Sequence, residues 1–266
     1  MFMAGVLRSA KAYATAFGNW RSVLGYLMVQ DVGQRFKSSR LAAIMAICEP
    51  ILLIVLLVAF RGIFRGRVAE FGTSIWVFYS SGVFPFYVFQ RVSARTRAKY
   101  AAFNRLPRVS STNLLIASAT AEAEIILTSM MIWFTILWLC GEREAVPTSI
   151  GACLIALMLL ALLGGGVGLL NSAISERYYV WTFVYGRTSR FLLFLSGVYY
   201  IIDLLPYHIR AVVVWNPIGH GIELFRLGLY GQYPVLTLDL GYFIGCTAAA
   251  LFIGVIAHQG TLRYSK

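Results

Sequence analysis

Six runs of mainly apolar residues, each about twenty residues long, alternate with shorter polar segments along the chain. An α-helix needs about 20 apolar residues to cross the hydrocarbon core of a bilayer. We therefore predict an all-α integral membrane protein with six transmembrane helices, at residues 41–60, 72–89, 113–139, 150–170, 178–202 and 237–257. They form one predicted domain, with residues 1–40 before the six-span bundle of 41–257 and a tail at 258–266.

The segment between the last two runs, residues 203–233, is only half apolar. It is too polar to span a bilayer and too apolar to be a plain loop. Lipid cannot satisfy freed backbone groups, so such a segment lies at membrane depth only where it is buried in protein or lines a wet cavity. We predict two short helices that re-enter the membrane from one face, with the earlier spans as walls around them.

Residues 20–37 precede the first span and repeat apolar side chains every three or four positions. Polar residues, including Arg35 and Lys37, take most of the other side. This pattern predicts an N-terminal amphipathic helix in the plane of the membrane interface. It serves either as a simple anchor or as a lever that senses a partner protein on the cytoplasmic face.

Composition supports the membrane class and leaves little room for a soluble domain, because 59 % of residues are hydrophobic and 13 % are charged. The first eleven residues lack the apolar core of a secretion signal, so we expect the N-terminus to be retained. The four cysteines show no short paired spacing. They are expected to be packing residues, with no metal or disulfide chemistry.

The net charge of +12 is unevenly distributed among the polar segments. Seventeen lysines and arginines fall on the side that includes both termini, and six fall on the other side. Cytoplasmic loops carry an excess of these residues. Both termini are therefore predicted to be cytoplasmic, and residues 203–233 to face outward.

Two basic segments stand out. The outward loop 61–70 carries three arginines against one glutamate, which fits either an anionic cargo or lipid headgroups.

The cytoplasmic segment 91–108 is longer than a connection requires and combines charge with apolar side chains. We interpret it as a docking element for a cytoplasmic subunit, the alternative being anchoring to the anionic leaflet. Its candidate contact residues are Arg91, Arg95, Arg97, Lys99, Tyr100 and Phe103.

Carboxylates occur inside two predicted spans, at Glu49 in the first and at Glu122 and Glu124 in the third. Charged groups at that depth are costly and face the bundle interior or a partner. They belong either to a proton relay or to helix-to-helix hydrogen bonds. We favour the second interpretation because no histidine or further acidic chain continues a relay. Pro50 is expected to kink the first span.

The fifth span mixes aromatic residues with arginines. Aromatic rings suit the C–H faces of sugars and arginines pair with carboxylates or phosphates, so together they favour a path for an acidic glycan. If the span instead begins nearer Ser189, the arginines lie at the headgroups and the aromatics form an interface belt. The candidate path residues are Tyr178, Trp181, Tyr185, Arg187, Arg190, Tyr199 and Tyr200.

Four glycines at positions 164–166 and 168 lie in the apolar fourth span and lack the Lys-Ser/Thr of a phosphate loop. Close helix packing is the better explanation. No nucleotide-binding motif occurs in the sequence. We expect no catalytic residue, metal or cofactor in this chain, with any ATP and Mg²⁺ bound by another subunit.

Three stretches together resemble one known family. They are W-N-P-I-G-H-G-I-E-L-F-R-L-G-L-Y-G-Q-Y at 215–233, Q-R-F-K-S-S-R-L-A-A-I-M-A-I-C-E-P at 34–50, and G-V-F-P-F-Y-V-F at 82–89. In order and spacing they are similar to the membrane subunits of bacterial ATP-binding cassette exporters of capsular polysaccharide, relatives of the O-antigen and teichoic-acid export permeases.

The resemblance implies a homodimeric inner-membrane permease whose subunits each dock on a cytoplasmic ATPase. The interfacial helix, with Arg35, and the basic segment after span two would contact the ATPases. The outward helices would form a periplasmic gate from Trp215, Asn216, Pro217, His220, Glu223 and Arg226. Further implied partners are a periplasmic copolymerase, an outer-membrane channel and a lipid-linked glycan.

Other functions remain open at this point. A related permease for O-antigen or teichoic-type glycan, or for small amphiphiles or drugs, would share the fold. A passive channel or structural anchor needs no ATPase and leaves the basic segment unexplained. A membrane enzyme is disfavoured because no His, Cys and acidic residues cluster with catalytic spacing.

Overall fold

The computed structural model describes residues 40–64, 69–94 and 111–264, and within these ranges the chain is all-helical. The predicted interfacial helix at 20–37 and most of the basic segment 91–108 lie outside the described residues. Eight α-helices and two 3₁₀ turns are described, the turns at Arg143–Ala145 and Ile202–Leu204. The helices are α2 (Arg40–Phe64), α3 (Ile75–Ala94), α5 (Ser111–Leu139), α6 (Ile150–Arg177), α7 (Val180–Leu195), α8 (Tyr207–Val213), α9 (Pro217–Tyr230) and α10 (Leu240–Tyr264).

Each of the six predicted apolar runs overlaps one α-helix, namely α2, α3, α5, α6, α7 or α10. Among the described residues, four segments are long and apolar enough to cross a membrane: Ile44–Ile63, Ile116–Leu139, Ile150–Arg177 and Leu240–Gly260. The other two helices are less apolar or shorter, because α3 carries buried polar side chains and α7 has 16 residues. The chain is therefore a multi-pass membrane protein.

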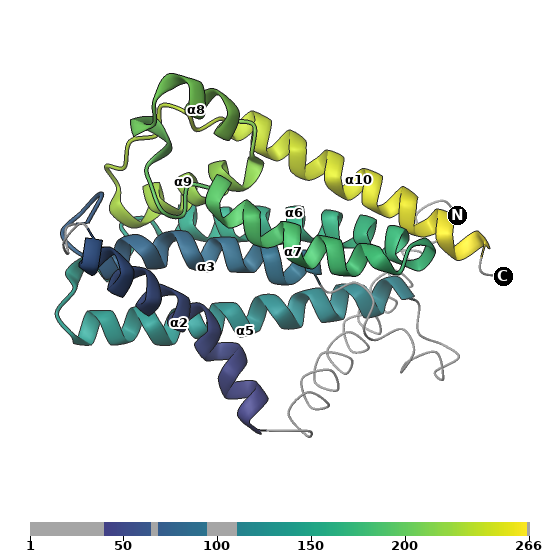
Figure 1. Ribbon diagram of the computed structural model, residues 1–266, viewed down its shortest axis with the longest axis horizontal. Helices are drawn as coiled ribbons and strands as arrows, with labels where there is room; N and C mark the ends of the chain where they lie inside the picture. The colour runs from purple at the N-terminus through teal and green to yellow at the C-terminus, as the bar shows by residue number, and fades with distance from the viewer. Residues whose placement is uncertain (1–39, 65–68, 95–110, 265–266) are drawn as a thin grey trace, which may run out of the picture.

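The helix α3 is the centre of the bundle. Every residue from Val77 to Phe89 is buried, and α3 packs against α2, α5, α6, α7 and α9. Figure 1 shows α3, α5, α6, α7 and α10 running roughly along the long axis, with α2 tilted across them. The helices α8 and α9 lie together at one end of the bundle (Figure 1).

The glycines of α6 allow close helix packing, as the sequence predicts. A Cβ atom on Gly164 would lie 2.8 Å from the carbonyl oxygen of Phe89 on α3, and one on Gly166 would lie 2.5 Å from the backbone of Ala250 on α10. Small residues let helix backbones approach in this way. The helix α6 is thereby held between the centre of the bundle and the last helix.

Local sequence explains why the short helices begin and end where they do. Asn216 caps α9, since its side-chain oxygen accepts a hydrogen bond from the Ile218 amide at 3.1 Å. Pro217 occupies the first helical position, where no amide donor is needed. At the other end Gly231 adopts a φ of 72°, which glycine tolerates and other residues rarely adopt. These signals set both ends of α9, the second of the two short helices in the segment 203–233.

Candidate functional site

The short helices α8 and α9 are tied to the end of α7 by Asn216. Its side-chain nitrogen donates to the Leu195 carbonyl at 3.1 Å and to the Ser196 hydroxyl at 2.9 Å. Because the same side chain caps α9, one residue joins the helix start to the preceding long helix. Trp215 beside it is 74 % exposed, so the indole is available to lipid or to a partner.

Arg226 on α9 is almost fully buried and binds the turn after α7. The side chain is 1 % exposed, and its guanidinium lies 4.2 Å from the ring centre of Phe78 on α3. All its hydrogen-bond acceptors are neutral. They are the carbonyls of Gly197 (2.8 Å), Val198 (2.9 Å) and Tyr200 (3.1 Å) and the hydroxyls of Ser81 (3.2 Å) and Tyr233 (3.1 Å).

This arrangement explains how a charged group is accommodated inside an apolar bundle. A guanidinium carries five N–H donors in a fixed planar fork, which lysine cannot reproduce. Here the fork fills the space among α3, α9 and the turn 197–200. Arg226 therefore fixes the shape of that turn. A wet path for this arginine is not required.

Glu223, one turn before Arg226, is also buried, at 1 % exposure. One of its carboxylate oxygens accepts from the Thr237 hydroxyl at 2.9 Å. Nearby, the Asp203 carboxylate accepts from the amides of Leu236 and Thr237 at 2.8 and 3.0 Å. Burial raises the pKa of Glu223 to about 7; the Thr237 bond and Arg226 oppose the shift, and Asp203 adds to it.

His220 connects α9 to the start of α10. Its Nδ1 accepts from the Asp239 amide at 3.2 Å, so we assign the proton to Nε2, which then donates to the Val214 carbonyl at 2.8 Å. Burial lowers the pKa of His220, while the Val214 carbonyl and Asp239 oppose the shift. The imidazole therefore bridges three segments as a neutral group. The structure brings the predicted gate residues together on α9 and its entry turn.

The predicted path residues in and just before α7 do not share one surface. Tyr178, Arg187 and Arg190 are exposed, and the Arg187 guanidinium lies 3.9 Å from the ring centre of Phe183. Trp181 and Tyr185 instead hydrogen-bond to other helices at 3.0 and 2.8 Å. The helix begins at Val180, so both arginines are helical residues.

Tyr199 and Tyr200 belong to the turn that follows α7. The Tyr200 hydroxyl donates to the Phe194 carbonyl at 2.8 Å, and the Tyr199 ring stacks on the Phe194 ring with centres 5.2 Å apart. Both tyrosines are partly buried. Of the seven predicted path residues, Tyr199 is the one that lines the pocket described next.

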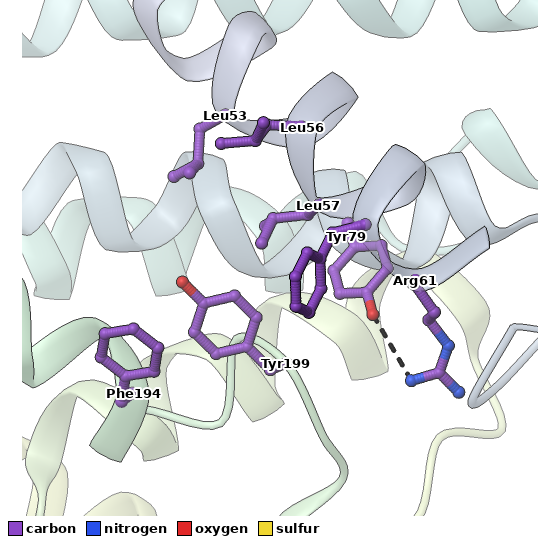
Figure 2. A pocket seen from close by; sticks show the side chains of 8 residues that line it. Leu53, Leu56, Leu57, Arg61, Tyr79, Phe194 and Tyr199 are labelled. Carbon is purple, nitrogen blue, oxygen red and sulfur yellow. Dashed lines mark hydrogen bonds between the residues drawn. The ribbon is translucent and has the colours of Figure 1, made fainter. Parts of the chain in front are cut away.

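An apolar pocket of about 560 Å³ lies between α2 and the end of α7. Figure 2 shows the Tyr199 hydroxyl directed toward the leucines of α2 and a hydrogen bond from Arg61 to Tyr79 at the pocket edge. Arg61 also forms a 2.6 Å ion pair with Glu70. The lining residues are Leu53, Leu56, Leu57, Phe60, Arg61, Tyr79, Phe194 and Tyr199.

Sequence reasoning missed this pocket. A weak signal was present, since Leu53, Leu57 and Arg61 recur every four residues and so share one face of α2. That face also fits ordinary packing. Only the fold shows that the end of α7 leaves space beside it.

A second polar cluster joins three helices near the other end of the bundle. Arg91 on α3 lies 3.5 Å from the Glu122 carboxylate on α5 and pairs with Glu49 on α2. Glu122 is fully buried, whereas the Glu49 side chain is 55 % exposed. The two glutamates share one guanidinium between helices, which favours the helix-to-helix interpretation over a relay.

The predicted docking residues are described only in part. Arg91 lies in α3 and is engaged by the two glutamates, so its role toward a cytoplasmic subunit stays a prediction. The remaining candidates lie outside the described residues; these are Arg35, Arg95, Arg97, Lys99, Tyr100 and Phe103.

These features define a class: a multi-pass helical membrane protein in which a pair of short helices is pinned to the bundle by buried polar side chains. The sequence model of the ABC-2 type transporter family matches residues 23–230, and the chain belongs to this family.

Several characterised proteins are similar to the chain over most of its length. It is 27 % identical over 237 residues to the polysialic acid transport protein KpsM of Escherichia coli, covering 88 % of this chain and 91 % of that protein. It is 25 % identical to the capsule polysaccharide export inner-membrane protein BexB of Haemophilus influenzae, with 88 % and 89 % covered. The capsule polysaccharide export inner-membrane protein CtrC of Neisseria meningitidis serogroup A is 26 % identical, with 92 % of each chain covered.

Proposed function

We propose that this chain is the membrane permease subunit of an ATP-driven exporter that moves lipid-linked capsular polysaccharide out of the cytoplasm. One observation carries the proposal: relatives with capsule or polysialic acid export in their names align with about nine-tenths of the chain, well beyond the most apolar segments. The matched region therefore includes polar segments between the apolar helices.

The proposed topology has six spans in the inner membrane, with both termini cytoplasmic. Lysine and arginine distribution supports this orientation. The helices α8 and α9 are then outward and re-entrant, and they form a gate. Their buried polar side chains support this role, because irregular backbone at membrane depth needs internal hydrogen-bond partners.

The proposed complex contains two copies of this chain and two cytoplasmic ATPase subunits. ATP and Mg²⁺ bind to the ATPases, and this chain has no catalytic role. The family assignment supports an ATPase partner. A periplasmic copolymerase and an outer-membrane channel complete the proposed route for the glycan.

The proposed cargo is acidic, because exposed arginines occur on the helix assigned to the cargo path. Arg187 and Arg190 both project from α7. The apolar pocket beside Tyr199 suits a lipid chain, since its walls are mainly leucine and phenylalanine side chains and Arg61 lies at its edge. Sugars would then contact the middle of α7, and the lipid would contact its end.

The first test is deletion of the gene, followed by fractionation of surface and cytoplasmic glycan, with the wild-type gene returned on a plasmid. If the chain is a polysaccharide export permease, acidic polysaccharide should disappear from the surface of the deletion strain and accumulate inside the cells. Loss of an O-antigen or teichoic-type glycan from the surface would instead identify that related cargo. Unchanged surface glycan with increased sensitivity to an amphiphile would favour a small-molecule exporter.

A second test addresses the arginines. The double variant Arg187→Gln/Arg190→Gln is expected to reduce surface glycan while the protein still accumulates in the membrane. The charge-matched control is Arg143→Gln/Arg177→Gln, which changes two exposed arginines outside α7. Equal export by both double variants would contradict a cargo role for the α7 arginines.

A further inference from the structure

The first half of α7 is held to two other helices by side-chain hydrogen bonds that meet at Ser93. The Tyr185 hydroxyl donates to the Ser93 hydroxyl at 2.8 Å. The Asn171 amide donates to the Ser93 carbonyl at 3.1 Å and accepts from the Trp181 indole at 3.0 Å. We refer to Ser93, Asn171, Trp181 and Tyr185 as the Ser93 cluster, which joins α3, α6 and α7.

Few side chains of α7 are fully buried, so side-chain hydrogen bonds are important contacts of its first half. The buried side chains of α7 are Ser189 and Leu193, both in its second half. In the cluster, Ser93 is 0 % and Asn171 is 3 % exposed, so water cannot replace a broken bond there. A buried polar group that loses its partner is strongly disfavoured. The cluster therefore determines how the first half of α7 is oriented.

The Ser93 cluster lies between the predicted ATPase-docking segment and the helix proposed to contact the cargo. Ser93 lies in the last turn of α3 and within the segment 91–108, which is predicted to dock the ATPase. The helix α7, which the cluster joins to α3, also carries Arg187 and Arg190, the proposed cargo contacts. The cluster therefore connects the end of α3 to the first half of α7.

We propose that the Ser93 cluster is the joint that couples the ATPase to α7, and that Asn171, Trp181 and Tyr185 are positioning residues for export. The proposal rests on the proposed function. It adds the specific side chains through which ATP-driven movement at the cytoplasmic end reaches the helix that meets the cargo.

The main test uses Tyr185→Phe in the complete exporter, in inverted membrane vesicles. This change keeps the ring and removes one hydrogen bond. ATP hydrolysis and uptake of glycolipid extracted from the deletion strain are measured together. The expected result is ATP hydrolysis near the wild-type rate and about fivefold less glycan moved per ATP, the factor that corresponds to a hydrogen bond of about 1 kcal/mol.

Thr182→Val is the matched control, because Thr182 donates to Ser175 on α6 at 3.2 Å and does not contact Ser93. It should leave the ratio of glycan to ATP unchanged. Proportional loss of hydrolysis and uptake by Tyr185→Phe would indicate a merely structural role and overturn the proposal. A wild-type ratio of glycan moved to ATP hydrolysed in both Tyr185→Phe and Asn171→Leu would also overturn the proposal.

A second readout does not depend on the cargo. Cys48, Cys140, Cys153 and Cys246 are all free, so they are replaced by alanine and Phe191→Cys is labelled with a maleimide. ATP with vanadate should change the labelling rate, and Tyr185→Phe should reduce that change about fivefold. The proposal is overturned if Tyr185→Phe leaves the change in labelling rate undiminished. It is also overturned if ATP with vanadate does not change the labelling rate when the cluster is intact. Absence of ATP-driven glycan uptake by wild-type vesicles would refute only the proposed function.

Discussion

Gly166 on α6 and Gly254 on α10 pack backbone against backbone. A Cβ atom built on Gly254 would collide with the Gly166 carbonyl oxygen, and one built on Gly166 would lie 2.5 Å from the backbone of Ala250. Backbone cannot swing aside as a flexible side chain does. The close contact between these two helices therefore requires glycine, which has no Cβ atom, at both positions.

Gly166→Ala is accordingly expected to lower stability by about 1–3 kcal/mol, the range for overpacking a tight contact. The measurement is the temperature at which purified protein in detergent loses its monodisperse elution peak. Gly165→Ala is the control, because a Cβ there meets nothing within 4 Å. Alanine also favours helix over glycine, so the control should be neutral or slightly stabilising. Similar losses for both variants would contradict the contact.

Arg226 provides a second prediction, since it donates to three carbonyls of the turn 197–200. Arg226→Met keeps the length of the side chain and leaves those acceptors without donors. We expect a loss of at least about 3 kcal/mol, from several buried acceptors at about 1–3 kcal/mol each. Arg226→Lys should recover little, because an ammonium group cannot form the fork.

The same elution assay measures the effect of these variants. Arg143→Met serves as the control, because Arg143 is exposed in a 3₁₀ turn. An Arg226→Met protein as stable as this control would show that the turn is held by other contacts.

The ion pairs of Arg91 predict non-additive behaviour. Arg91→Gln removes the cation beside the buried Glu122 carboxylate and should cost about 3–5 kcal/mol. Adding Glu122→Gln should restore part of the loss, because the buried negative charge is then gone. Glu49→Gln should have a smaller effect, since the Glu49 side chain is 55 % exposed.

The double-mutant cycle is read from the stability of the four proteins in detergent. Additive losses would show that Arg91 and Glu122 do not interact. Export by the Glu122→Gln variant separates the two interpretations of this carboxylate. Normal stability with abolished export would favour a relay over packing.

The long helices could be predicted from the sequence because bilayer thickness sets a minimum apolar length. Their ends were harder to predict. The fourth span was expected to end at residue 170, yet α6 continues to Arg177. Asn171, Ser172 and Ser175 are polar but buried. The predicted span ended before these polar residues, whereas in the fold they are buried and at least Asn171 forms hydrogen bonds with other helices.

Roles of single residues were harder to predict than helices. Arg91 follows an apolar run and was therefore interpreted as a loop residue for docking. It lies in α3 opposite Glu49, which is 42 positions earlier in the chain. Tyr185 and Arg187 were placed on one cargo path, but one side chain bonds to Ser93 and the other is exposed. Sequence periodicity does not show which distant helix lies opposite a side chain.

Glu223 gives a pH-dependent prediction. Burial raises the pKa of Glu223 from 4.5 to about 7 in the folded protein, so folding favours the protonated form. A carboxyl group shifted upward contributes stability that is fully present below pH 4.5 and is lost as the pH rises through 7. Wild-type protein should therefore lose thermal stability between about pH 5 and pH 8.

Glu223→Gln mimics the protonated carboxyl and can still accept the hydrogen bond from Thr237. Its stability should vary less with pH, and at pH 8 it should exceed that of the wild type by up to about 3 kcal/mol, from 1.36 kcal/mol per pKa unit. Glu124→Gln is the control, because Glu124 is exposed, and it should follow the wild-type pH profile. The elution assay at pH 5, 6, 7 and 8 compares the three proteins. A Glu223→Gln profile parallel to the wild type would show that the Glu223 carboxyl does not change charge over this range, and would contradict the prediction.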